Sequence, residues 1–259
     1  MPANPYLHPV THAWGRSLVR GMMSWWHMIH FGAIVLVMAL SPSTYNRVNR
    51  ANTSQHIYAS TWQVLPWFTA LSTLLSVVLI RVVVVTASSY GLSQYALEMV
   101  VRVLVLEFIP LSAAMFVALR AGLAGDNTLA QQTGQSLRLS IPRLRRELVP
   151  RVLADAFSVL ALAVVSSVIS LVLAYVTVHG LSLWGLPGFT RSVGHVFDLP
   201  VSLGFALKSL LFSLAVAVVP LAAMLDPTRS PASTEQPGAV RLFLVLLLIE
   251  AASLAVKYV

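Results

Sequence analysis

Cysteine and charge are what this sequence lacks most. None of its 259 residues is cysteine, which excludes disulfides, thiolate metal sites and cysteine nucleophiles. Only 10% of the residues are charged, whereas a soluble domain carries about 25%. With 57% hydrophobic residues, a water-soluble fold of this length could not hide its apolar surface, but a lipid bilayer can accommodate it. The composition therefore predicts an integral membrane protein.

Acidic residues are scarcer than basic ones. Nine Asp and Glu stand against 17 Lys and Arg, which gives a net charge of +8. In a soluble protein such a balance would suggest nucleic acid as a partner. Here the arginines cluster between apolar runs, which is typical of topology signals and of contact with anionic lipid headgroups. No nucleic-acid partner is therefore expected.

Catalytic motifs are also missing. The sequence contains no GxxxxGK[ST] phosphate loop, so the chain should not hydrolyse nucleotide by itself, and it contains no HExxH or GxSxG. His27 and His30 form an HxxH spacing with His8 and His12 upstream, but no carboxylate accompanies them. We expect no catalytic residue, no metal site and no cofactor in this chain.

Five apolar stretches are long enough to cross a bilayer, which requires about 20 helical residues. They cover 64–86, 98–120, 152–178, 201–224 and 240–256. A further stretch over 21–40 could span or lie along the interface. Its tryptophans Trp25 and Trp26, preceded by Arg16 and Arg20, favour an interfacial helix over 13–41. The prediction is an all-α integral membrane protein with five transmembrane helices and an N-terminal interfacial helix, in a single domain over 1–259.

Arginine placement predicts the orientation. The connection 121–150 and its end carry Arg138, Arg143, Arg145, Arg146 and Arg151. By contrast, 87–97 has no Lys or Arg, and the only Lys or Arg in 179–200 is Arg191. Cytoplasmic loops are the basic ones, so 121–150 should lie in the cytoplasm. Five spans then give a cytoplasmic N-terminus and an external C-terminus.

Several ionisable residues fall inside the predicted spans, where each charge costs about 2.5–3.5 kcal/mol to insert. Glu98 and Arg102 are four residues apart and can pair on one helix, as can Arg151 and Asp155. Each of these pairs lies near the end of its span. A structural role accounts for both.

Glu107 and Lys208 lie in the middle of their spans, without an opposite charge one turn away. They could neutralise one another between helices, either as a packing ion pair or as part of a lipid cavity. Glu107 follows Glu98 by nine residues, which in an α-helix turns it to the opposite side. Glu250 could pair with Arg81 or Lys208, and Pro110 should bend the second span.

The segment 90–125, YGLSQYALEMVVRVLVLEFIPLSAAMFVALRAGLAG, resembles the MlaE family, the permease subunits of ABC transporters that work with MCE proteins. Glu107 and Pro110 match the Glu and Pro of its Arg-Glu-Leu-Gly-Pro motif, although Leu106 replaces the Arg. Arg120 matches the Arg before a small-residue stretch. LVPRVLA at 148–154 and ALKSLLFSL at 206–214 resemble later family motifs, and Glu250 falls on a family Asp.

The resemblance implies a dimeric inner-membrane permease that moves phospholipid or another hydrophobic molecule. The implied partners are a cytoplasmic ABC ATPase dimer that binds ATP and Mg²⁺, a second permease chain (identical or paralogous), and an external MCE-domain protein. The segment 121–150 would couple to the ATPase, although it lacks the acidic residues of the family motif.

The resemblance also implies roles for individual residues. Tyr90, Leu75 and Val78 would contact lipid, together with Glu107 and Lys208. Pro110, Arg120 and Glu250 would serve gating or packing. The alternative is a proton-coupled secondary transporter that uses Glu107 or Asp155 as a relay. A membrane-embedded enzyme is disfavoured, because no nucleophile–base pair is present.

Overall fold

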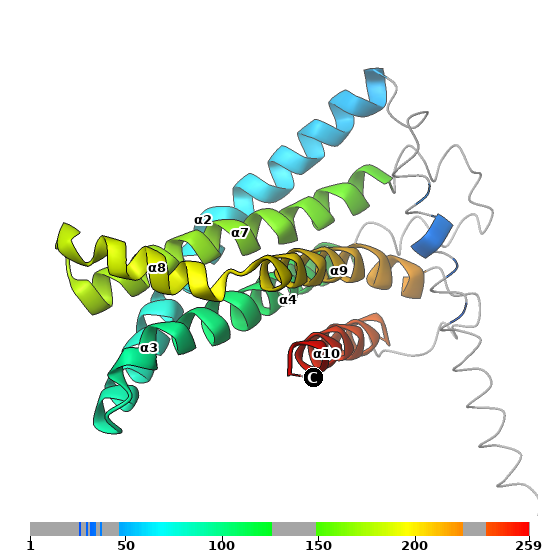
Figure 1. The fold of residues 1–259 in the computed structure, drawn as a ribbon. Coiled ribbons are helices and arrows are strands. Elements are labelled where there is room, and N and C mark those ends of the chain that lie inside the picture. Colours follow the sequence, from blue (N-terminus) through cyan, green and yellow to red (C-terminus); the bar gives the residue numbers. More distant parts are fainter. Residues whose placement is uncertain are drawn as a thin grey trace, which may run out of the picture.

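The computed structural model describes residues 47–125, 149–224 and 237–258, and single positions or short runs at 26, 30, 32–34 and 37. This part of the chain is helical apart from short turns, as the sequence predicts (Figure 1). Its elements are α2 (Arg47–Ser89), α3 (Ser93–Val100), the π-helix η2 (Val101–Phe108), α4 (Ile109–Gly125), α7 (Val149–His179), the 3-10 helix η4 (Leu183–Gly185), α8 (Leu186–Val196), α9 (Leu199–Met224) and α10 (Pro237–Tyr258).

Five helical stretches in the described residues are long and apolar enough to cross a membrane. They are Val64–Ser89, Tyr95–Ala121, Val149–His179, Leu199–Ala223 and Gly238–Lys257. Every end lies within three residues of the predicted one. The five long apolar helices are thus present as predicted, because a run of some 20 apolar residues satisfies its backbone in lipid as a helix.

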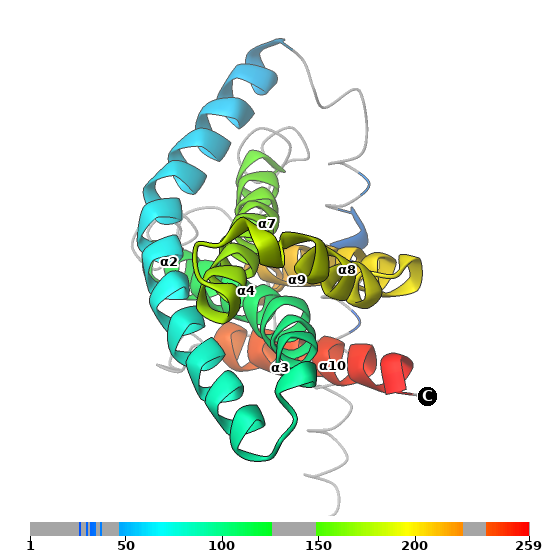
Figure 2. The same cartoon turned by 60° about the vertical axis from the view of Figure 1, so that its left-hand side comes forward.

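Helix α2 is longer than the span it contains. Its 43 residues measure about 65 Å at 1.5 Å per residue, whereas its apolar part begins only at Val64. Figure 2 shows it bowed along one edge of the bundle. The exposed rings of Tyr58 and Trp62 stack at 5.8 Å where the polar part meets the apolar part. Aromatic residues favour this membrane–water boundary.

The second span changes helix type at its centre. The backbone N–H of Ile109 donates to the carbonyl of Leu104, five residues earlier, which is the π-helical pattern. Pro110 follows directly and has no N–H to donate to the carbonyl of Leu106, so the α-helical pattern cannot continue through this point. The span therefore contains a π-helix of eight residues on the N-terminal side of Pro110, the residue at which a bend is predicted.

Small and hydroxyl-bearing residues hold the helices close together. Ala113, Ala114 and Ala163 are completely buried in the main core, where α2, α4, α7, α9 and α10 meet. Helix α2 packs most extensively on α7. Two buried hydroxyl pairs join these helices: Thr61 Oγ1 lies 3.0 Å from Ser158 Oγ, and Ser76 Oγ lies 2.7 Å from Ser170 Oγ. Hydroxyl bonds of this kind link helices in lipid.

The connection between α7 and α9 contains the short helices η4 and α8. Phe189, Val193, Val196 and Phe197 turn the apolar side of this connection toward the bundle. Glycine at position 185 is required by a close approach, because a Cβ there would lie 2.7 Å from Cγ of His179. The apolar runs of the sequence do not indicate these short helices.

Two predicted segments lie wholly or largely outside the described residues. They are the interfacial helix over 13–41, of which only isolated positions are described, and the coupling segment over 121–150, of which 126–148 is not described. Both remain predictions.

Candidate functional site: a chain of ion pairs inside the bundle

Glu107 enters the bundle from the π-helix η2. Its side chain is 16% exposed, and its two carboxylate oxygens bind different lysines. Oε2 accepts a hydrogen bond from Lys208 of α9, whereas Oε1 lies 2.9 Å from Nζ of Lys257 near the end of α10. The predicted pairing of Glu107 with Lys208 is present. Lys257, whose role the sequence analysis missed, is a second cation on the same carboxylate.

Lys208 is the most buried charge of the site. Its side chain is 3% exposed, and its ammonium also lies 2.7 Å from Oε2 of Glu250 on α10. This contact is an ion pair without hydrogen-bond geometry. The ammonium lies 5.7 Å from the ring centroid of Phe212, one turn further along α9, where the face of the ring favours a cation. Of the two partners considered for Glu250, the structure selects Lys208.

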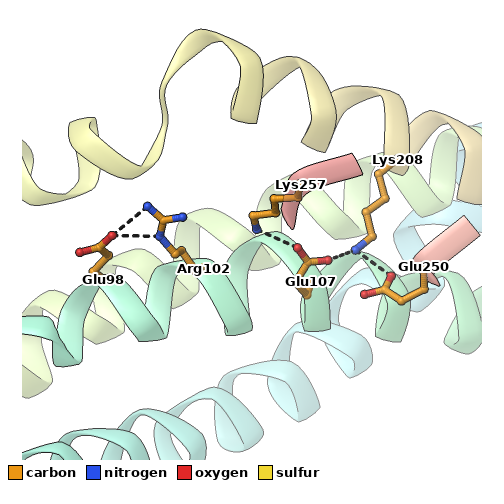
Figure 3. Close-up of polar contacts among 6 residues, drawn as sticks. All are labelled: Glu98, Arg102, Glu107, Lys208, Glu250 and Lys257. Atoms are coloured by element: carbon orange, nitrogen blue, oxygen red, sulfur yellow. Dashed lines mark hydrogen bonds and ion pairs between the residues drawn. The ribbon is translucent and has the colours of Figure 1, made fainter. Parts of the chain in front are cut away.

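The four residues form one chain in the order Lys257, Glu107, Lys208 and Glu250, which Figure 3 shows between η2, α9 and α10. Two positive and two negative side chains alternate, so the group is neutral as a whole. Removing one member would leave a neighbour charged and buried, which is costly in a low-dielectric interior. The chain therefore ties three membrane spans together through charge, and we call it the ion-pair chain.

Glu98 and Arg102 form a second pair. Arg102 Nε donates to Glu98 Oε1 at 3.0 Å, and Arg102 Nη2 lies 2.8 Å from the same oxygen. The predicted pairing is confirmed. Both side chains remain close to half exposed, at 40% for Arg102 and 43% for Glu98.

The predicted direction of Glu107 is wrong. That prediction assumed α-helical geometry from Glu98 to Glu107, but Val101–Phe108 is a π-helix. Hydrogen bonds between residues five apart bring such residues toward the same side, so Glu107 comes round toward Arg102. Figure 3 shows Glu98, Arg102 and Glu107 projecting from one side of the α3–η2 helix.

The remaining predicted site residues lie elsewhere. Leu75 and Val78 are exposed on α2, and Tyr90 is 76% exposed at the turn that follows this helix. Pro110 is buried directly after η2, and Arg120 lies near the end of the same span. Asp155 interacts electrostatically with Arg151 and Arg120 rather than with the ion-pair chain. The structure brings together Glu107, Lys208 and Glu250, and it leaves Tyr90, Leu75 and Val78 on the outer surface.

Lys257 escaped the sequence analysis because it follows the last apolar run and looks like a terminal charge. A signal was available: Glu107, Lys208 and Glu250 alone carry one positive and two negative charges. Another cation would balance the second carboxylate and so stabilise the buried cluster. Which lysine or arginine supplies it depends on the tilt of α10, which a sequence does not give.

Five apolar helices long enough to cross a bilayer, three of them tied together by buried ion pairs, define a multi-pass membrane protein. The family model for the permease MlaE matches residues 53–256, which include all five spans, and the chain belongs to this family. No curated protein matches the sequence. The protein is accordingly the non-catalytic membrane permease subunit of an MCE-associated ABC lipid transporter, and permeases of this family hold no cofactor in the chain.

Proposed function

We propose that this subunit moves phospholipid or another hydrophobic molecule between the bacterial inner membrane and a tunnel formed by an external MCE-domain protein. Energy comes from a cytoplasmic ABC ATPase dimer bound to the segment 121–150. A second permease chain, identical or paralogous, completes the pathway. The observation that carries the proposal is the ion-pair chain, which places four charged side chains inside an apolar bundle.

The ion-pair chain could give the permease two conformational states, one with its charged partners in contact and one with them separated. Lys208 binds both Glu107 and Glu250. While the ion-pair chain is intact, α9, α10 and the second span therefore move as a unit. Movement of the coupling segment on ATP binding would separate or reconnect these partners. Glu107 and Lys208 then stabilise one state of a lipid cavity, and Pro110 and the π-helix before it supply the deformable point.

The surface that we propose to contact the transported lipid lies on α2. Leu75 and Val78 are exposed within its apolar span and would contact acyl chains, and Tyr90 follows at the predicted external end. Glu250 on α10 and Arg120 near the end of the second span would keep the helices in register when the partners of the ion-pair chain separate or reconnect. Each role is separable by substitution.

The experiment that tests the function is reconstitution. The chain is purified in mild detergent with the proteins that accompany it, and lipid transfer is measured in proteoliposomes with and without ATP. We expect an ATPase and an MCE-domain protein to copurify, and we expect transfer to require ATP. A stable monomer that transfers lipid without nucleotide, or transfer driven by a proton gradient alone, would refute the proposal.

A neutral version of the ion-pair chain separates packing from transport. The quadruple variant Glu107→Gln, Lys208→Met, Glu250→Gln and Lys257→Met removes all four charges of the ion-pair chain and leaves none of them without its partner, so the bundle should assemble. Transport should nevertheless fall by an order of magnitude or more, because the charges that favour one state are gone. Wild-type transport in this variant would show that the charges serve packing only.

A further inference from the structure

The Glu98–Arg102 pair has binding capacity that the fold does not use. Both hydrogen-bond contacts of the pair converge on Glu98 Oε1. Among the described residues, no hydrogen bond or ion pair engages Glu98 Oε2 or Arg102 Nη1. Because the two side chains are 43% and 40% exposed, the pair can offer a carboxylate oxygen and a guanidinium nitrogen to a ligand.

The surroundings of the pair are those of a lipid rather than a solute. Tyr95, Met99 and Val103 lie on the same stretch of helix and are 48%, 47% and 61% exposed. Glu98 and Arg102 lie three and seven residues after the start of the span at Tyr95, about 5 and 10 Å along a helix. The span has 27 residues and is about 40 Å long, which matches a bilayer including its headgroup regions. Glu98 therefore lies near the boundary between headgroups and hydrocarbon, and Arg102 lies just inside the hydrocarbon.

The charge of the site favours one class of headgroup. The pair is neutral as a unit, with one anionic and one cationic side chain, and the ion-pair chain further along the span is neutral too. Neither attracts a headgroup of net negative charge. A headgroup that carries both a phosphate and an ammonium matches the pair, because the guanidinium binds a phosphate in fork geometry and the carboxylate accepts from an ammonium.

The π-helix η2 puts the Glu98–Arg102 pair on the same side of the helix as the ion-pair chain. Because η2 brings Glu107 round toward Arg102, the pair and the ion-pair chain lie along one side of the α3–η2 helix (Figure 3). In an uninterrupted α-helix they would face different sides of the bundle. The half-exposed pair thus forms the accessible end of a row of charges that continues into the buried chain.

We propose that Glu98 and Arg102 bind the headgroup of a zwitterionic phospholipid, with the phosphate on Arg102 and the ammonium on Glu98. This proposal rests on the proposed lipid transport and names the substrate class that the permease selects. The pair lies at the predicted external end of the second span, where lipid is exchanged with the external partner. Binding there orients the headgroup outward and leaves the acyl chains along the exposed residues of the span.

The test is lipid selection by the intact complex. Wild-type protein is reconstituted in nanodiscs with equal phosphatidylethanolamine and phosphatidylglycerol, re-extracted in mild detergent, and its bound lipids are quantified by mass spectrometry. We expect phosphatidylethanolamine to be enriched. Arg102→Gln should lower total bound phospholipid about tenfold, the value of one charge-assisted hydrogen bond. Glu98→Gln should keep bound lipid but abolish the preference for phosphatidylethanolamine.

Two further variants separate binding from structure. The double variant Glu98→Arg and Arg102→Glu retains an ion pair but reverses its direction, so a purely structural role would be preserved, whereas headgroup binding should be lost. Arg81→Gln, which removes an exposed arginine from α2, serves as the control and should keep the wild-type lipid profile. Wild-type selection in the reversed variant would overturn the proposal, as would equal amounts of both lipids on the wild-type protein. If ATP-dependent transfer persisted in either case, the proposed function would stand without this headgroup site.

Discussion

Lys257 and Glu107 are 150 positions apart in the chain, yet the ammonium of Lys257 lies 2.9 Å from Oε1 of Glu107. The contact joins the end of the last span to the centre of the second. It gives Glu107 two cations, because Lys208 binds its other carboxylate oxygen. The two lysines differ in burial, since Lys208 is 3% exposed and Lys257 is 17% exposed. Substitutions at the two positions should therefore have unequal effects.

The first prediction concerns Lys208. Lys208→Met should destabilise the bundle by about 3–5 kcal/mol, because Glu107 and Glu250 would then be buried without the cation between them. Unfolding of the purified protein in mixed detergent micelles measures the loss. Lys257→Met is the matched control and should cost clearly less, because Glu107 keeps Lys208 and position 257 ends its span. Equal losses in the two variants would contradict this order.

The second prediction uses the absence of native cysteine. Ser76 and Ser170 have their hydroxyl oxygens 2.7 Å apart in the contact between α2 and α7. Ser76→Cys with Ser170→Cys should form a disulfide under mild oxidation, because the two side chains already meet. Loss of maleimide labelling after oxidation, regained with reductant, is the measurement. Ser88→Cys with Ser170→Cys, in which Ser88 is exposed at the end of α2, should stay reduced.

The same crosslink reports on movement. If α2 slides along α7 during transport, the Ser76–Ser170 disulfide should stop ATP-dependent lipid transfer, and reductant should restore it. Full activity of the oxidised protein would mean that these two helices move as one body. Both results can be interpreted, because no other cysteine exists to form a competing disulfide.

The third prediction concerns the turn between α7 and α8. Gly185→Ala should destabilise the protein by about 1–3 kcal/mol, because the added methyl group meets the ring of His179 and forces it to move. His179→Ala removes that ring, so the double variant His179→Ala with Gly185→Ala should show no further loss from Gly185→Ala. Thermal unfolding of the four proteins completes the cycle. Additive losses would show that His179 is not the obstacle.

The fourth prediction concerns orientation. Leu181 is 89% exposed after the third span, in a connection predicted to be external. Leu181→Cys should react with a membrane-impermeant maleimide added to intact cells, whereas Ser136→Cys in the basic segment 121–150 should react only after the membrane is opened. The reverse pattern would invert the proposed topology and place the Glu98–Arg102 pair at the cytoplasmic side.

The sequence by itself determined the spans and the charges placed within them. An apolar run of about 20 residues satisfies its backbone hydrogen bonds in lipid by forming a helix, so the five helices followed from composition and length. The pairing of Glu98 with Arg102 followed as well, because a spacing of four residues is local. Glu107 and Lys208 stood out because an unpaired charge in mid-span requires a partner somewhere.

Only the tertiary structure decided how these charges meet. The π-helix at Val101–Phe108 turned Glu107 to a side that α-helical spacing had excluded, and the placement of α10 brought Lys257 and Glu250 to the same site. Helix type before a proline and the tilt of a packed helix depend on contacts between distant segments. Hydrophobicity fixes which residues enter the membrane, but it is equally satisfied by many rotations of each helix, so packing and charge pairing select among them.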